Sequence, residues 1–416
     1  MRRMSWLRVS TVVVASLGAG CFPSLSQLSD GTGRSDGGHD AIGMQTDATG
    51  LGDVRVGAHD GTVDAHDAGA DGSESQDGGS DAIADARVVT TLNGTYRIAR
   101  LTSDMLALYF STEETDGGQG SYQMVEALLL DDAGVAVSMP MKVTAGNSYG
   151  VIGDGRGSVY YSVGAGPMSG NAKIVRASLD DLADAATVVA PDGGVGLGFA
   201  LGSGDVYFGN ADGIRRAPTD ASQPSPSTSL TSMSPSTSAT FEVFAGESIY
   251  FLTSIGGLWS VPASGGSPSN AVPATSNIAP VSSGAYPATA SNGTTLVWRT
   301  PALRDGGQLP HLVGGSGVAY LTANGQGFLI APTDGGLFPL VRDVAIDGTN
   351  AYVLQGDLDC ANGTGVLLQK SLTGHEAPLP LATGLFCPTH VTATNDRVYF
   401  TQVVSGEQTI YMVPRR

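Results

Sequence analysis

The sequence predicts an all-β domain over residues 88–416, a β-propeller of seven four-stranded blades, with six or eight blades as the alternatives. Three observations predict it. A tripeptide of the form aliphatic-Tyr-aromatic returns along the chain, its copies lie about 47 residues apart, and most copies follow a turn signal rich in Gly, Asp or Asn. Short strands and tight turns at such a period are typical of blades repeated around an axis.

The tripeptide marks one strand in each repeat. Its aliphatic and aromatic residues favour a half-buried strand, and the packing of neighbouring blades would bury the central tyrosine. The central residues of successive copies are 51, 47, 43, 47, 55 and 47 residues apart. Five copies are complete and two are degenerate: Leu108-Tyr109-Phe110, Val159-Tyr160-Tyr161, Val206-Tyr207-Phe208, Ile249-Tyr250-Phe251, Val398-Tyr399-Phe400, and then Leu296-Val297-Trp298 and Ala351-Tyr352-Val353.

The residues around each tripeptide predict the other strands of the unit. A short apolar stretch and a turn such as Ser291-Asn292-Gly293 precede it, and Asn-Gly or Asp-Gly adopts the positive backbone angles of tight hairpins. A further strand that ends in proline, such as 258–262, follows it. The expected order in each unit is inner strand, tight turn, tyrosine strand, loop, third strand, turn and outer strand.

Three segments depart from this regular pattern. Val318-Ala319-Tyr320 follows Val297 by only 23 residues, too few for four strands of about 5 residues each, so one blade is expected to be irregular. Residues 88–98, with the turn Asn93-Gly94, are expected to complete the last blade and close the ring, because Pro414 ends a third strand. Residues 222–240, rich in Ser, Thr and Pro, are expected to form an extended loop.

The first twenty residues have the features of a cleaved signal. Arg2, Arg3 and Arg8 precede an apolar run over 9–19, about half the ~20 residues that a membrane-spanning helix needs. Residues 17–21 then resemble the bacterial lipobox, which implies cleavage before Cys21 and acylation of that cysteine. Gly18 departs from the pattern, since a leucine usually stands there. Ordinary signal-peptidase cleavage, a twin-arginine signal and a permanent span are the alternatives.

Residues 21–87 are predicted to be a disordered acidic linker. From Phe22 to Arg87 the sequence holds twelve Asp and one Glu against three Arg, and no aromatic residue follows Phe22. Such a chain buries too little apolar surface to offset the entropy lost on folding. We therefore expect a solvated tether that separates the domain from the bilayer.

Net charge limits the kinds of partner. The chain carries −18, of which the signal contributes +3 and the linker −10, which leaves −11 on residues 88–416. A nucleic-acid partner is not expected, because binding phosphates needs a basic surface. Contact with the membrane is expected only through the lipid on Cys21. These features predict a monomer in the bacterial cell envelope, lipid-anchored at the outer membrane or the cell surface.

The repeats resemble a known group of bacterial propellers, the NHL and YWTD-like type. The resemblance covers about 88–416 and depends on the Val-Tyr-Phe strand and on the turn Pro262-Ala263-Ser264-Gly265-Gly266. It implies a fold much more than an activity, since propellers support many functions.

Few residues of the domain are candidates for chemistry. Cys360 and Cys387 are predicted to lie in loops on one face and to form a disulfide in an oxidising compartment. His390, with Asp357 and Asp359, is the only candidate polar cluster for the central funnel, and it is a weak one because zinc needs three or four converging ligands. We predict no metal, no cofactor and no catalytic residue.

Three functions follow as hypotheses. The first is a noncatalytic binding or scaffold module that presents one propeller face to an envelope protein or glycan. The second is a propeller lyase or hydrolase with His390 as general base, similar to streptogramin lyases. The third is an outer-membrane assembly factor, although the tryptophan repeats of that propeller lipoprotein family are not visible here.

Overall fold

The computed structural model describes residues 86–416 apart from short connections. The gaps are 93–95, 115–123, 145–147, 149, 165–171, 183–185, 193–197, 203, 211–212, 221–225, 233–239, 247, 254–256, 274–275, 281–287, 301–315, 333–339, 357–362 and 405. Cys21 and the predicted linker up to residue 85 therefore lie outside the described residues.

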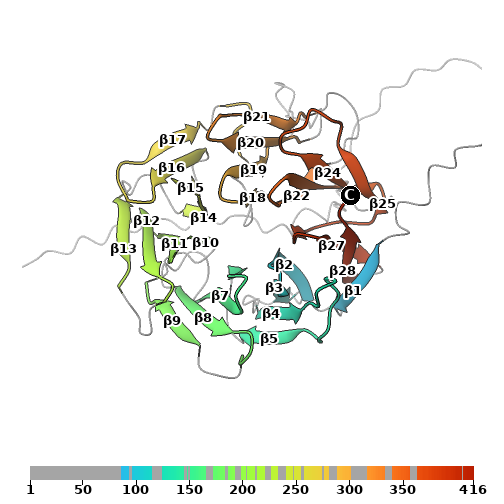
Figure 1. Cartoon of the computed structure of the whole chain (residues 1–416), viewed down its shortest axis with the longest axis horizontal. Coiled ribbons are helices and arrows are strands. Elements are labelled where there is room, and N and C mark those ends of the chain that lie inside the picture. Colours follow the sequence, from blue (N-terminus) through green and yellow to red (C-terminus); the bar gives the residue numbers. More distant parts are fainter. Residues whose placement is uncertain are drawn as a thin grey trace, which may run out of the picture. The chain divides into compact units, whose positions relative to one another are not determined.

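The described residues form seven antiparallel sheets of four strands each, arranged in a ring (Figure 1). This is the predicted β-propeller with seven blades. In chain order blade 1 is β2 (Tyr96–Ser103), β3 (Ala107–Glu114), β4 (Met124–Leu129) and β5 (Met141–Thr144); blade 2 is β6 (Val151–Gly153), β7 (Ser158–Val163), β8 (Lys173–Ser178) and β9 (Thr187–Ala190); blade 3 is β10 (Phe199–Leu201), β11 (Asp205–Asn210), β12 (Gly213–Pro218) and β13 (Thr228–Ser232). Blade 4 is β14 (Thr240–Ala245), β15 (Ser248–Thr253), β16 (Leu258–Pro262) and β17 (Ser269–Val272); blade 5 is β18 (Thr289–Ser291), β19 (Thr295–Arg299), β20 (Val318–Thr322) and β21 (Gly325–Ile330); blade 6 is β22 (Leu340–Ile346), β23 (Asn350–Gly356), β24 (Gly365–Ser371) and β25 (Leu379–Leu385). Blade 7 is β26 (Val391–Ala393), β27 (Arg397–Val404), β28 (Glu407–Pro414) and β1 (Arg87–Leu92).

Every predicted tyrosine tripeptide lies in the second strand of a blade. Tyr109, Tyr352 and Tyr399 have no exposed surface, and they belong to three of the apolar clusters that fill the space between the sheets. Adjacent blades therefore hold together by burying these aromatic side chains, which is the hydrophobic term expected of a stacked repeat.

Both ends of the described domain meet in blade 7. β1 pairs with β28, from Arg87 opposite Met412 to Leu92 opposite Gln408, and supplies the outer strand as predicted. The predicted span is too long at its far end, because the strand stops at Leu92 and Ile98 lies in β2, the inner strand of blade 1. Hydrogen bonds between two distant segments, without a chain connection, thus close the ring.

The short spacing around Val318 arises within one of the seven blades: β19 and β20 are the second and third strands of blade 5, paired from Thr295–Thr322 to Arg299–Val318. Another expectation needs correction. The stretch 222–240 is not a loop throughout, because β13 (Thr228–Ser232) is the outer strand of blade 3 and pairs with β12.

The antiparallel order gives the ring two different faces. Tight turns between inner and second strands lie on one face, which we call the turn face. The connections from second to third strands and from one blade to the next lie on the other, which we call the loop face. Among the described residues, no helix is long and apolar enough to cross a bilayer.

Candidate functional site

A central channel of about 360 Å³ runs between the seven inner strands. β2, β6, β10, β14, β18, β22 and β26 all contribute to its wall, so each blade presents one short segment to it. The volume lies within the range of ~300–1,000 Å³ that is typical of small-molecule pockets.

The wall of the channel has two chemically different sides. Blades 2, 3 and 4 contribute only apolar residues and glycine, in the stretches 151–153, 199–201 and 243–245. Every polar residue of the described wall comes from blades 5, 6, 7 and 1: Thr289, Ser291, Arg342, Asp343, Thr389, His390, Thr392, Arg100, Thr102 and Ser103. Any molecule in the channel therefore meets an apolar surface on one side and a polar, charged surface on the other.

His390 links blade 7 to both neighbouring blades. Its Nε2 lies 2.8 Å from the carbonyl oxygen of Ile98 in blade 1, and its Nδ1 lies 3.8 Å from Oδ2 of Asp343 in blade 6. A carbonyl only accepts hydrogen bonds, so Nε2 carries the proton. Both ring nitrogens thus face partners on the protein itself.

Asp343 and Gln408 extend this link. Oδ2 of Asp343 accepts a hydrogen bond from the backbone N–H of Val391 at 3.0 Å, across the boundary between blades 6 and 7. Oε1 of the buried Gln408 accepts one from the N–H of Ile98 at 2.6 Å. A register shift between Ile98 and Arg100 leaves Ala99 without a partner in the ladder, and blade 7 binds both polar main-chain groups of the adjacent Ile98.

Arginines make the polar side of the wall predominantly basic. Arg100 and Arg342 line the channel, and Arg299 lies behind β22, where its Nη1 donates to the carbonyl of Val341 at 3.1 Å. Burial lowers the pKa of Arg299, the charge of Arg342 lowers it further and that of Asp343 opposes the change. Asp343 is the one acidic residue of the described channel wall.

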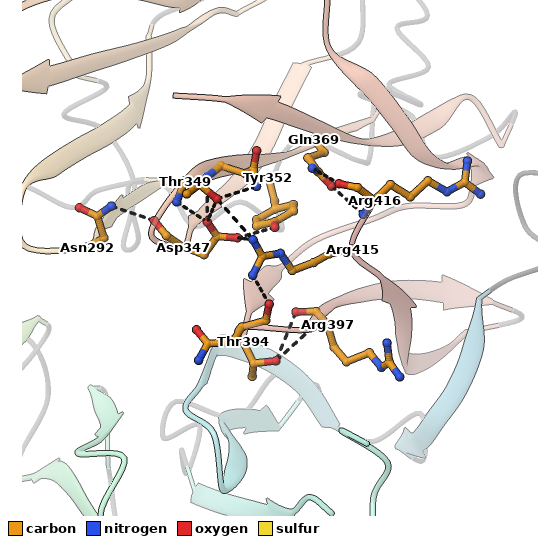
Figure 2. Close-up of polar contacts among 11 residues, drawn as sticks. Asn292, Asp347, Thr349, Tyr352, Gln369, Thr394, Arg397, Arg415 and Arg416 are labelled. Atoms are coloured by element: carbon orange, nitrogen blue, oxygen red, sulfur yellow. Dashed lines mark hydrogen bonds and ion pairs between the residues drawn. The ribbon is translucent and has the colours of Figure 1, made fainter. Parts of the chain in front are cut away.

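A second polar network lies on the turn face, where Arg415 contacts blades 6 and 7 (Figure 2). Its Nη2 lies 3.1 Å from Oδ2 of Asp347, and its Nη1 donates to the carbonyl of Asn395. Oδ1 of Asp347 accepts from the N–H groups of Thr349 and Asn350 at 2.6 and 2.7 Å, and Oδ2 accepts from the hydroxyl of Tyr352 at 2.5 Å. The side chain of Asp347 is only 5% exposed, so this network fixes the turn and the end of β28 together.

The structure places one of the predicted site residues in the channel. His390 lies in the wall, as predicted, but its acidic neighbour is Asp343. Asp357 and Asp359 lie outside the described residues. Within the described part of the chain, no group of three or more His, Cys, Asp or Glu residues converges as metal ligands would.

The structure describes only one of the two cysteines in the predicted disulfide, Cys387. Cys387 lies between β25 and β26, three residues before His390, with an unusual positive φ of 44°. Cys360 lies outside the described residues, so the Cys360–Cys387 disulfide stays a prediction.

Asp343, Arg342 and Arg100 were not predicted from the sequence, although an alignment of the blades would have shown two of them. The position four residues before the tight turn holds Arg100 in blade 1, Asp343 in blade 6 and His390 in blade 7. Blades 2, 3 and 5 carry Gly150, Gly198 and Ala288 at the same position, and blade 4 carries Glu242. Charge at one level in three adjacent blades is the signal that single repeats do not show.

Comparison with known proteins identifies no family. No protein-family model matches the chain, and no curated protein matches its sequence. Solved propellers resemble the fold at low identity. The β-propeller domain of the Trilobed protease from Pyrococcus furiosus has a TM-score of 0.48 at 9% identity and covers 77% of this chain and 95% of that one. The WD40 repeats of RRP9 have a TM-score of 0.49 at 10% identity and cover 80% and 98%. Puromycin hydrolase, in the complex of its S511A mutant with PGG, has a TM-score of 0.45 at 13% identity and covers 69% and 53%.

Proposed function

We propose that the chain is a bacterial envelope lipoprotein, tethered through a lipid on Cys21, whose propeller is a noncatalytic binding module for a protein or glycan. The anchor and the compartment depend on the signal and lipobox pattern of residues 1–21. The acidic linker would hold the propeller away from the bilayer. Stable attachment requires more than one acyl chain, which the lipobox resemblance implies.

The geometry of His390 supports a noncatalytic role. A general base needs an unprotonated nitrogen that can reach a substrate. In this structure Nε2 donates to the carbonyl of Ile98, and Nδ1 faces Asp343. The imidazole therefore links blades 6, 7 and 1, and this structural role counts against its use as the base of a lyase or hydrolase.

The loop face is the proposed binding face. Phe386 and Val404 lie there, 48% and 39% exposed, and the N–H of Val403 donates to the carbonyl of Phe386 at 3.2 Å. The predicted Cys360–Cys387 disulfide would restrain this face. Thiol titration of the unfolded, unreduced mature protein tests that bond, and two free thiols per chain would contradict it.

Site-specific photocrosslinking in intact envelopes tests the function. A photoreactive residue replaces Phe386 on the loop face or, as the control, Met139 on the turn face, which is 83% exposed. We expect a discrete crosslinked protein or glycan from position 386 and none from 139. Crosslinks only from 139 would reject the loop face, and crosslinks to outer-membrane assembly proteins would favour the third hypothesis. A Cys21→Ser variant that stayed in the membrane fraction would reject the anchor.

A further inference from the structure

The two-sided wall of the central channel carries an inference that goes beyond the proposed envelope partner. We infer that the channel binds a small amphipathic acid, a molecule with one carboxylate and one apolar flank. The inference depends only on the residues of the inner strands. It requires neither the lipid anchor nor a partner on the loop face.

The basic side of the wall is where the carboxylate of the ligand would bind. Arg342 of blade 6 and Arg100 of blade 1 line the channel on the two sides of His390 in blade 7. The acidic residue next to Arg342, Asp343, already accepts the N–H groups of Val344 and Val391 at 2.9 and 3.0 Å. A guanidinium has five N–H donors in a planar array that matches a carboxylate, so an arginine in contact with its own chain can still bind one.

The apolar part of the ligand would pack against the opposite side of the channel. Ile152, Leu201 and Ala245 line the channel and remain partly exposed. Val151, Phe199 and Val243 in the same stretches of the wall are between 2% and 5% exposed and belong to the apolar clusters between the blades. Packed residues of this kind form a stiff wall, so apolar surface stays available without the collapse that would hide it.

The size of the ligand follows from volume and charge. The channel of about 360 Å³ is near the small end of the range for pockets that hold a small molecule. Residues 88–416 carry a net charge of −11, which repels large acidic polymers at a distance. A small acid enters the local field of the arginines, where short distance and partial burial strengthen the attraction.

Calorimetry with three probes tests both halves of the inference in the unmodified protein. The probes are 4-phenylbutyrate, its uncharged analogue 4-phenylbutanol, and acetate, which lacks the apolar body. We expect 4-phenylbutyrate to bind and each of the other two to bind at least about tenfold more weakly, because each loses one side of the wall. Absence of 4-phenylbutyrate binding at millimolar concentration overturns the inference. Equal binding of the alcohol overturns the role of the arginines, and equal binding of acetate overturns that of the apolar side.

Variants then locate the probe. Arg342→Gln and Arg100→Gln should each weaken 4-phenylbutyrate binding about tenfold or more, and Leu201→Ser should weaken it with a smaller change for acetate. Arg156→Gln, in an exposed turn of blade 2 on the turn face, is the matched control and should bind as the wild type does. Wild-type affinity in both channel arginine variants, each folded by circular dichroism, places the probe elsewhere and overturns the inference. The comparison of the three probes uses the wild-type protein, so it still tests the inference if one of the variants misfolds.

Discussion

Blades 6, 7 and 1 are joined differently from blades 2, 3 and 4. In the first group, polar contacts cross the blade boundaries at the channel, through Asp343 and His390, and at the turn face, through Arg415 and Asp347. In the second group the described channel wall is apolar. Polar contacts there lie farther out, as in the pair Arg215–Asp192, with Nη2 and Oδ2 3.3 Å apart on blades 3 and 2.

The difference coincides with the place where the ring closes. Blades 2 to 4 follow one another along the chain, so covalent connection already keeps them adjacent. Blade 7 combines β1 with β26, β27 and β28 from the other end of the domain, and only noncovalent contacts hold β1 there. Apolar burial is nondirectional, whereas hydrogen bonds fix distance and angle. We infer that the polar links at the channel and the turn face set the register of closure.

The largest expected effect is that of Asp347→Ala. The substitution removes the acceptor of Tyr352, of two turn N–H groups and of Arg415 at a site that is almost fully buried. Unpaired buried donors cost about 1–3 kcal/mol each, so we expect the free energy of unfolding to fall by roughly 2–4 kcal/mol. Urea unfolding followed by circular dichroism measures it.

Asp154→Ala provides the matched control in blade 2. Asp154 also accepts two turn N–H groups, those of Arg156 and Ser158, but those contacts are more exposed. We expect a loss of about 1 kcal/mol or less. Equal losses for the two variants would mean that the turn alone matters and that the contact with Arg415 adds nothing to closure.

The pH dependence of the free energy of unfolding should also distinguish blades 6, 7 and 1 from blades 2, 3 and 4, but by a smaller amount. Burial alone would raise the pKa of Asp347, but the hydrogen bonds from Tyr352, Thr349 and Asn350 and the charge of Arg415 outweigh it and hold that pKa below its usual value. A depressed folded pKa stabilises the protein above the unfolded value, about 3.9, and this contribution is lost as pH falls through the folded pKa.

The measurement compares wild type with Asp347→Asn by urea unfolding between pH 6 and pH 2. The difference in free energy of unfolding should be largest at pH 6 and should shrink below about pH 4, where the carboxylate gains a proton. A difference that stays constant over this range would show that the charge of Asp347 does not stabilise the folded state.

Much of the fold could be predicted because the repeated tyrosine tripeptide, which indicates a propeller, is required by burial between the blades. Tyr109, Tyr352 and Tyr399 are buried between blades, so each repeat needs an aromatic residue at that place and the period stays visible. Outer strands face solvent and need no such pattern. β13 has the sequence Thr-Ser-Leu-Thr-Ser, in which Leu230 and Thr231 are buried, and nothing in it distinguishes a strand from a polar loop.

The candidate site could be predicted only in part, for a topological reason. His390 was recognisable at the start of an inner strand, and inner strands line the channel. Its acidic neighbour comes from the preceding blade, 47 residues earlier, whereas the acids considered with it, Asp357 and Asp359, lie outside the described residues. Radial repeats place residues of equal register side by side, so the partner is found by comparing repeats and not by proximity in sequence.

The smallest effect, and the most direct test of the channel link, is the coupling between His390 and Asp343. A double-mutant cycle with His390→Ala and Asp343→Asn measures it, again by urea unfolding. The two side chains are about one-fifth exposed and 3.8 Å apart, and they attract each other only while the imidazole is protonated. Solvent weakens this attraction, so at about pH 5, where an ordinary histidine is protonated, we expect a coupling of about 0.5–1 kcal/mol. The control cycle pairs Asp343→Asn with Arg215→Ala on the other side of the ring, where the effects should add to within about 0.5 kcal/mol.

Each outcome of this cycle changes the account of closure. A coupling near zero would leave the hydrogen bonds of Ile98 and Val391 as the only channel links between blades 6, 7 and 1, since these bonds do not require the pair to interact. Coupling of the same size in the control cycle would show that stability is shared around the whole ring. Coupling confined to His390 and Asp343 would mean that closure is fixed locally, at the blade that two distant segments of the chain must build together.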